Sequence, residues 1–281
     1  MFNKNFLPLF LSFIIWSSWL IPVRLLGENA ITVAFFTTIF AAFFWGVVYL
    51  KDKSKKTFER KKIFGLLTLS VFFVLNMLTY LGALKYTDAA IAVLTHYTAP
   101  VFVAFIAPFV LKEKITKDKI LSLILSLLGF TIIFFKKTVN SQNFLFGAGL
   151  GLASGLFYAL IIVTAKKVLQ NFDKYPLLFF QNFFGSIWLL FLYKEINFSA
   201  SLQIYFILFL LSFLYSVVAS YFYITSLSRI EGTKVAIIGY IEPVGTIFWG
   251  WLFFQESITI KTVVGAVLIL YSGYRVASNS G

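Results

Sequence analysis

The segment YTAPV at residues 97–101 returns 143 residues later as YIEPV at residues 240–244. The duplication extends to both sides, because nine of the 37 aligned positions from Tyr80 to Thr116 carry the same residue in both copies. In the first copy these positions are Tyr80, Leu84, Tyr97, Pro100, Val101, Phe105, Glu113, Ile115 and Thr116. A repeat at half the chain length, inside an apolar sequence, is typical of a transporter built from two halves around a central site.

The composition indicates that lipid is the solvent of this chain. Hydrophobic residues make up 60% of it and charged residues only 12%. Apolar runs recur at nearly the length of about 20 residues that crosses a bilayer as a helix. We expect ten transmembrane helices, the first of them retained and not cleaved as a signal peptide. The predicted spans are 6–26, 30–50, 63–83, 88–111, 119–135, 145–166, 175–193, 203–226, 232–254 and 260–277.

The basic residues predict the orientation of these helices. The net charge is +13, and the Lys and Arg residues fall mainly in alternate loops, 18 on one side and six on the other. The positive-inside bias therefore predicts a multi-pass protein of the cell (cytoplasmic) membrane with both termini in the cytoplasm. Nucleic-acid binding is disfavoured, because the charge forms no stripe on a soluble surface.

The repeat and the charge pattern together predict an inverted architecture. We expect an all-α protein with one five-helix repeat in residues 1–138 and a second in residues 144–281. Five crossings are an odd number, so the second copy must enter the membrane from the opposite side. The densely basic loop 51–62 agrees with this, since its counterpart holds only Lys194. Inverted repeats suit transport by alternating access.

These residues resemble a known family. The paired copies of Tyr80–Leu84, Pro100 and Glu113, and above all the segment Ile241-Glu242-Pro243, are similar to the EamA branch of the drug/metabolite transporter superfamily. The resemblance implies ten-helix carriers of amino acids, nucleosides, vitamins and other small metabolites, frequently exporters. It also implies a central cavity lined by the first, third, fourth, sixth, eighth and ninth helices.

Glu242 is the leading candidate for a functional side chain. A carboxylate near the middle of a lipid-facing helix costs at least ~2.5 kcal/mol, so it should face the bundle interior. It is either a proton-coupling site, the partner of a substrate ammonium, or a structural group bonded to backbone loosened by Pro243. Its repeat counterpart is Ala99, so the acid is present in one half only.

His96 is the sole histidine and precedes Pro100 in a polar turn. Proline removes a backbone donor, which frees the preceding carbonyls for a neighbour or a ligand. We expect His96 to line the cavity. The full predicted substrate site is Trp16, Ser17, Asn76, Tyr80, Thr95, His96, Tyr97, Tyr158, Tyr215, Tyr223 and Glu242.

Other features have structural interpretations. The small residues Gly147, Gly151 and Gly155, and likewise Ser122, Ser126 and Gly129, are spaced for close helix packing. Glu113 and Glu256 are expected at helix ends near water. Asp88 and Glu231 precede predicted helices, where an acid interacts favourably with the N-terminus.

The sequence favours transport over other functions. Zero cysteines exclude thiol chemistry, and a lone histidine excludes the usual zinc sites, so we expect no metal and no cofactor. An enzyme is disfavoured because no nucleophile and base constellation is present. A receptor or scaffold is the alternative. It is disfavoured because the sequence predicts no extramembrane domain that could bind a protein partner. We expect a secondary transporter, an exporter or exchanger, acting as a monomer or weak dimer, with protons as a candidate coupling ion.

The substrate class stays open between several kinds of small molecule. One carboxylate, one imidazole and many hydroxyl and aromatic groups suit an amino acid or a related amphipathic compound. They also fit a nucleoside or a riboflavin-like vitamin.

Overall fold

The computed structural model describes residues 5–52, 60–87, 89–134 and 144–278. Within these ranges the chain is helical, with no strand, as the composition predicts. The helices are α1 (Phe6–Ser17), α2 (Leu20–Leu26), α3 (Ala30–Lys51), α4 (Arg60–Tyr86), α5 (Ala89–His96), α6 (Ala99–Val110), α7 (Lys117–Phe134), α8 (Phe144–Leu169), α9 (Lys174–Leu189), the 3₁₀ helix η1 (Leu190–Glu195), α10 (Leu202–Leu211), the π-helix η2 (Ser212–Ala219), α11 (Ser220–Arg229), α12 (Gly232–Ile238), α13 (Ile241–Phe254) and α14 (Ile260–Ser278).

Eight helical stretches in the described ranges are long and apolar enough to cross a membrane, and they coincide with eight predicted spans. The two predicted spans outside this set are 6–26 and 119–135. The first is divided into the short helices α1 and α2. The second, α7, opens with three charged residues, Lys117, Asp118 and Lys119. Ten crossings therefore stay a prediction at this point.

Several helical passages are interrupted inside the bundle. Pro100 follows the break between α5 and α6, where the amide of Val101 donates to the carbonyl of Thr98 over 2.9 Å instead of continuing the regular ladder. Pro243 follows the equivalent break between α12 and α13, and the amide of Glu242 donates to Gly239 over 3.0 Å. The polar turn predicted around His96 is therefore a real helix break.

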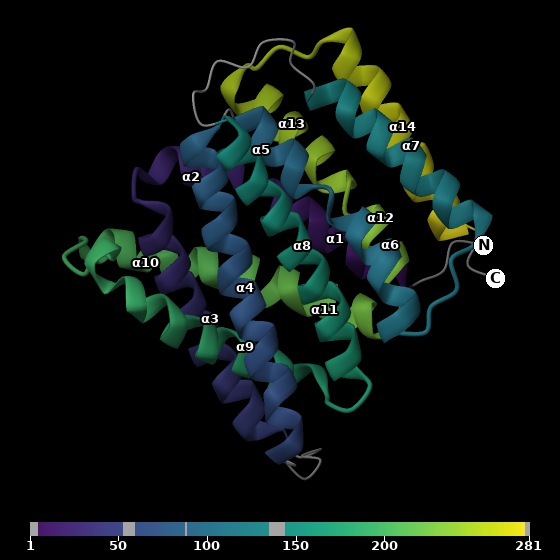
Figure 1. Ribbon diagram of the computed structural model, residues 1–281. Helices are drawn as coiled ribbons and strands as arrows, with labels where there is room; N and C mark the ends of the chain where they lie inside the picture. The colour runs from purple at the N-terminus through teal and green to yellow at the C-terminus, as the bar shows by residue number, and fades with distance from the viewer. Residues whose placement is uncertain (1–4, 53–59, 88, 135–143, 279–281) are drawn as a thin grey trace.

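Helices that correspond through the repeat pack against each other. The offset of 143 residues relates α3 to α9 and α7 to α14, and both pairs are in contact. Figure 1 shows α7 and α14 side by side along one edge of the molecule, with α3 and α9 together at another. The same offset relates α4 to the segment that contains α11, and α1 to α8. The contact between α4 and α8 therefore corresponds to the contact between α11 and α1. Even the backbone conformation repeats, because the two non-glycine residues with positive φ in the described ranges, Lys112 (58°) and Gln255 (55°), are counterparts.

Small residues permit the closest helix contacts. Gly129 of α7 faces Gly265 of α14, and a methyl group on either would meet the carbonyl of the other. Beside them the hydroxyl of Ser126 donates to that of Ser272 over 2.7 Å. The stripe Gly147, Gly151 and Gly155 brings α8 against α5 and the turn that follows it. Both stripes thus pack helices, as predicted.

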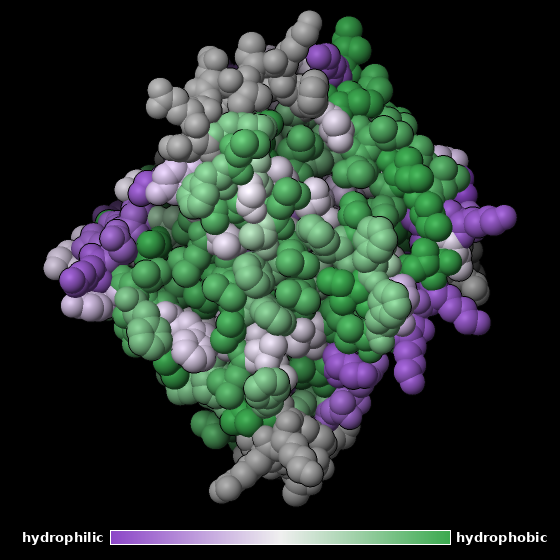
Figure 2. Space-filling model, in the orientation of Figure 1, coloured by the Kyte–Doolittle hydropathy of each residue, from purple (hydrophilic) through white to green (hydrophobic). Residues whose placement is uncertain are grey.

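The outer surface is apolar over most of its area. Large hydrophobic side chains such as Phe105, Phe109, Leu145 and Leu202 are more than two-thirds exposed. Figure 2 shows one face covered mainly by hydrophobic residues, with hydrophilic residues gathered at its margins. Contact between this surface and water is unfavourable, because its side chains are apolar. Contact with lipid tails carries no such penalty.

The glycine stripe on α8 generates a stability prediction. At Gly155 a Cβ atom would lie 2.8 Å from the carbonyl oxygen of His96 and 3.0 Å from that of Thr95, so Gly155→Ala should destabilise the fold by about 1–3 kcal/mol. Gly149 lies on the same helix with nothing within 4 Å of its Cβ position. Gly149→Ala should therefore leave stability unchanged or raise it slightly. Thermal unfolding in detergent checks both, and equal melting temperatures would contradict the packing role.

Candidate functional site

Glu242 lies in the first turn of α13 and faces a group of four tyrosines, here called the tyrosine cluster: Tyr80, Tyr97, Tyr158 and Tyr223. The hydroxyl of Tyr97 lies near the carboxyl group of Glu242 and interacts with it. The other three hydroxyls lie close enough to interact with the same carboxylate electrostatically. These side chains come from α4, the α5–α6 turn, α8 and α11, so both halves of the chain contribute.

His96 ends α5 and is enclosed by aromatic rings. Its imidazole stacks on Tyr158, with an interplanar angle of 8° and 5.3 Å between centroids, and lies 4.7 Å from the ring of Tyr80. Its Nδ1 atom is 2.8 Å from the hydroxyl of Ser154 on α8. The amide of Asn76 donates to the backbone oxygen of Ser154 over 2.8 Å and to its hydroxyl over 3.0 Å. His96 and Asn76 are thus joined through Ser154.

Trp16 extends the cluster toward α1. Its ring centroid lies 5.0 Å from that of Tyr223, and its indole N–H donates to the backbone oxygen of Tyr215 over 3.0 Å. The next carbonyl, that of Ser216, accepts from the indole of Trp45 over 3.2 Å. Both carbonyls belong to the π-helix η2, whose widened turn leaves oxygens available to side chains. The tryptophans therefore bind the backbone of the irregular helix.

Two buried tyrosines in this region differ in how their hydroxyls are used. Tyr240 is fully buried and donates to the backbone oxygen of Tyr97, its own repeat counterpart, over 2.8 Å. Tyr223 is 6% exposed, and its hydroxyl has no hydrogen-bond partner within the described ranges. A buried hydroxyl without a partner loses the hydrogen bonds that it makes in water, so a bound molecule or water that completes it is favoured.

Three of the residues expected from the sequence have other contacts. Ser17 donates to the carbonyl of Ile14 over 2.7 Å and accepts from the indole of Trp249 over 3.0 Å, which packs α1 on α13. The hydroxyl of Thr95 bonds back to Ile91, and that of Tyr215 bonds to Ser18 over 2.8 Å. The other predicted residues are brought together around Glu242 and His96. They are Trp16, Asn76, Tyr80, Tyr97, Tyr158 and Tyr223.

Sequence reasoning missed Ser154, Tyr240 and Trp45. Ser154 sits between two glycines that were interpreted as packing residues, and that close packing is what lets its hydroxyl reach His96. Tyr240 had a signal, since it duplicates Tyr97. For Trp45 no signal was available, because η2 contains no proline or glycine to mark the irregular turn.

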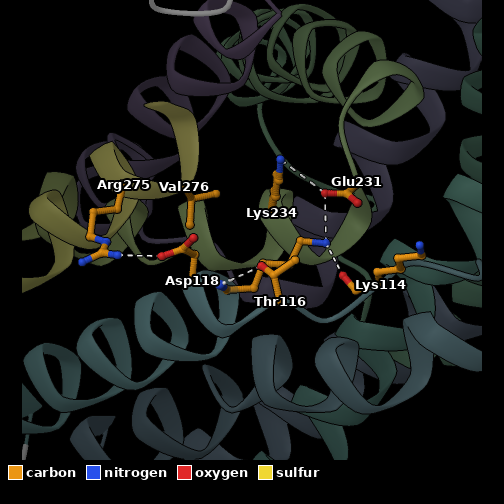
Figure 3. Close-up of a pocket in the computed structure, with 8 residues that line it drawn as sticks. Lys114, Thr116, Asp118, Glu231, Lys234, Arg275 and Val276 are labelled. Atoms are coloured by element: carbon orange, nitrogen blue, oxygen red, sulfur yellow. Dashed lines mark hydrogen bonds and ion pairs between the residues drawn. The ribbon is translucent and has the colours of Figure 1, made fainter. Parts of the chain in front are cut away.

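A charged pocket lies apart from the tyrosine cluster, where α6, α7, α11, α12 and α14 meet. It has a volume of about 310 Å³ and is lined by Lys114, Thr116, Asp118, Lys119, Glu231, Lys234, Arg275 and Val276. Figure 3 shows Lys234 directed toward Glu231 and Arg275 directed toward Asp118. The ammonium groups of Lys119 and Lys234 lie 3.0 and 3.4 Å from the carboxylate of Glu231, and Arg275 pairs with Asp118 at 2.7 Å. Burial disfavours the charge on Glu231, but the two lysines outweigh this effect and hold its pKa below the ordinary value. The carboxylate is therefore charged at neutral pH.

Glu113 corrects one expectation. It is only 9% exposed, instead of solvated, and its carboxylate crosses to the second half of the chain. There it accepts from the amides of Gly232 and Thr233, over 2.6 and 3.0 Å, and from the hydroxyl of Thr233 over 2.7 Å. It thus caps the N-terminus of α12. Glu231 occupies the N-cap position itself, but its side chain pairs with lysines and makes no cap bond. Asp88 lies outside the described residues.

The EamA-like transporter family profile matches residues 5–135 and again 145–275. The chain belongs to the EamA-like transporter family. It is accordingly a multi-pass membrane transporter of small molecules. The two matched segments repeat the duplication seen in the sequence, with one family unit in each half.

Relatives of this EamA-like transporter come from several organisms. The uncharacterized transporter YoaV of Bacillus subtilis is 30% identical over 204 residues, which cover 69% of this chain and 68% of that protein. An uncharacterized transporter of Clostridium kluyveri is 26% identical over 286 residues, 95% of this chain and 91% of its own. The pseudopaline exporter CntI of Pseudomonas aeruginosa is 24% identical over 213 residues, covering 75% and 74%. One solved crystal structure shares the fold across the full length of both chains, with a TM-score of 0.83 at 13% identity.

Within the described ranges of the transporter, no group of three His, Cys, Asp or Glu side chains is placed to hold a metal ion. The described side chains around Glu242 offer hydrogen bonding, aromatic stacking and one carboxyl group. These are the means by which a protein binds and releases a small molecule unchanged.

The two buried tyrosines provide a matched stability test. Tyr240→Phe removes a hydrogen bond to the freed carbonyl of Tyr97 and should destabilise the fold by about 0.6–1.7 kcal/mol, the range for bonds between membrane helices. Tyr223→Phe removes a hydroxyl without a partner and should leave the melting temperature unchanged. Thermal unfolding of both variants checks this. A loss for Tyr223→Phe as large as that for Tyr240→Phe would show that its hydroxyl is structural.

Proposed function

We propose that this protein is a secondary transporter, an exporter or exchanger, of amino acids or related amphipathic metabolites, and that the substrate binds between Glu242, His96 and the tyrosine cluster. The observation that carries the proposal is one carboxylate surrounded by aromatic hydroxyls from both halves of the chain, including the unpartnered hydroxyl of Tyr223. An intramembrane acid in such surroundings is a functional site by default.

The chemistry of this site supports an amine-bearing substrate. A carboxylate attracts an ammonium group, and tyrosine and tryptophan rings add favourable cation–π contacts. The hydroxyl groups can bond the polar remainder of an amino acid, while aromatic surface covers its side chain. Export is supported by the similarity to CntI, which exports pseudopaline. A nucleoside or a riboflavin-like vitamin is the alternative substrate, because stacking and hydroxyl contacts also suit a heterocycle.

A counterflow assay tests the proposed activity. Purified protein in sealed vesicles should exchange at least one amphipathic metabolite saturably, without ATP, in a panel of amino acids, nucleosides and vitamins. Exchange of nucleosides or vitamins but not of amino acids would move the assignment to the alternative substrate class. No exchange across the panel, together with stoichiometric binding of a protein, would favour a scaffold instead.

Glu242→Gln distinguishes the roles that this acid can have. The substitution keeps the shape and removes the ionisable proton. If Glu242 couples transport to protons, substrate exchange should persist while the response of uptake to an imposed pH gradient disappears. If it binds a substrate ammonium, the KM of amine substrates should rise at least tenfold while neutral substrates are spared. The matched variant His96→Gln should change substrate affinity and leave the pH response in place. Unchanged transport and pH response for Glu242→Gln, with a normal yield of folded protein, would make the residue structural.

We further propose that the chain crosses the cell membrane ten times, as inverted repeats in residues 1–138 and 144–281 with both termini in the cytoplasm. Two of the ten proposed crossings are not among the eight long apolar helices. One is formed by α1 with α2, whose break lies inside the bundle, and the other is α7, which packs along α14. The excess of Lys and Arg at one end supports the orientation.

Single-cysteine labelling tests this topology in a chain with no native cysteine. Thr116 and Ser257 are both exposed, after α6 and after its counterpart α13. A cysteine at Thr116 should react with a membrane-impermeant maleimide only from the cytoplasmic side, and one at Ser257 only from outside. The same sidedness at both positions would contradict the inverted arrangement.

Alternating access is supported by the contrast between two duplicated glutamates. Glu113 is buried and caps α12, whereas its counterpart Glu256 is exposed at the other end of the bundle. The end that holds Glu113 is also joined across the halves by Lys119 and Glu231. We propose that this end, the cytoplasmic one, is closed in the present conformation.

A further inference from the structure

We infer that Ser154 is a positioning residue, which holds the imidazole of His96 as its Nδ1–H tautomer so that Nε2 offers a hydrogen-bond acceptor to a donor group of the substrate. The inference rests on the proposed function, because it concerns the same site. It assigns a role to a residue that was not among the predicted site residues and states which end of a substrate faces His96 and Glu242.

The position of Ser154 follows from the packing of α8. Gly151 and Gly155 flank it, and their missing side chains let α8 approach the backbone of residues 92–98. Ser154 is fully buried, with its hydroxyl 2.8 Å from Nδ1 of His96. Four residues further along the same helix face, Tyr158 stacks on the imidazole at 8°. One helix face therefore fixes both the plane of the ring and the partner of one ring nitrogen.

The tautomer follows from counting hydrogens around the Ser154 oxygen. A serine hydroxyl has one proton to donate and can accept two hydrogen bonds. The amide of Asn76 donates to it over 3.0 Å, and the hydroxyl donates to the backbone oxygen of Asn76 over 3.1 Å. Its proton is then committed, so the 2.8 Å contact is a hydrogen bond only if Nδ1 of His96 carries the hydrogen.

The other tautomer would form fewer bonds. If the hydroxyl donated to Nδ1, it would give up its bond to the carbonyl of Asn76, and one acceptor site on the serine oxygen would be empty. Inside a bilayer no bulk water replaces a lost hydrogen bond, so the arrangement with all three bonds is favoured. A catalytic use of the Ser154–His96 contact does not fit this geometry, because the hydroxyl is enclosed on every side and no substrate carbonyl can reach it.

A neutral imidazole with its proton on Nδ1 has a lone pair on Nε2. Within the described part of the chain Nε2 makes no hydrogen bond, and the ring lies among Tyr80, Tyr97 and Tyr158 beside Glu242. The lone pair and the carboxylate both attract hydrogen-bond donors and repel anions. The ammonium end of an amino acid should therefore face His96 and Glu242, and its carboxylate should point elsewhere.

The single histidine makes the tautomer directly measurable. With ¹⁵N-labelled histidine, the full-length protein in lipid nanodiscs gives one imidazole in a long-range ¹H–¹⁵N NMR spectrum, recorded at about pH 8.5 where an ordinary imidazole is neutral. We expect the shift pattern of an Nδ1–H imidazole. Ser154→Ala should change it to Nε2–H or to a mixture. Ser12→Ala is the matched control, because Ser12 is equally buried but only bonds to its own helix.

The wild-type spectrum alone can overturn the assignment. An Nε2–H pattern in the wild type would refute it even if Ser154→Ala fails to fold, and an unchanged Nδ1–H pattern in folded Ser154→Ala would show that Ser154 does not position the ring. For the recognition step the probes are n-butylammonium chloride and sodium butyrate. Butylammonium should move the Nε2 resonance and butyrate should not. No response to butylammonium, or a response to butyrate alone, would refute this step. None of these readings requires transport, so a failed counterflow panel would affect only the proposed function.

Discussion

Helices that break inside a bilayer leave backbone carbonyls with no water to bond, and this constraint determines where the polar side chains of the bundle lie. The break before Pro100 frees the carbonyl of Tyr97, which takes the hydroxyl of Tyr240. The carbonyls of Tyr215 and Ser216 in the π-helix accept hydrogen bonds from the indoles of Trp16 and Trp45. Each of these aromatic residues has an apolar ring that packs between helices and one hydrogen-bond donor at its end that can bond a backbone carbonyl.

The candidate site is built around the same breaks. His96 and Tyr97 lie in the turn between α5 and α6, and Glu242 begins the helix after the second break. In a continuous helix, His96 and Tyr97 would point in directions about 100° apart. The irregular backbone therefore does two things at once: it demands hydrogen-bond donors, and it brings an imidazole, a carboxyl group and phenols to one place.

Much of the architecture was predictable, because lipid leaves few options. Apolar length predicts where helices run, and the described part of every predicted span is helical apart from the turns at 18–19, 97–98 and 239–240 and the helix end at Leu111. Proline and the duplication predict two of the breaks. The contacts of individual side chains were less accessible. Ser17 and Ser154 both look like small polar residues on apolar helices, and only packing decides that one joins α1 to α13 and the other holds His96. Glu113 appeared solvated because its partner amides lie 119 and 120 residues away in the chain.

The contact between Tyr97 and Tyr240 joins a residue to its own duplicate, and in the inverted arrangement that we propose such a contact lies where the two halves meet on their common axis. Two identical halves would present the same group from both sides at this place, so any difference between the copies records divergence after duplication. Two positions beyond these tyrosines the copies differ in charge, with Ala99 in one and Glu242 in the other. A symmetric ancestor with the acid in both copies would have faced two carboxyl groups across the axis, and their repulsion would oppose ionisation of the second. If Glu242 couples transport to protons, the presence of the acid in one copy only limits this position to one proton in each transport cycle.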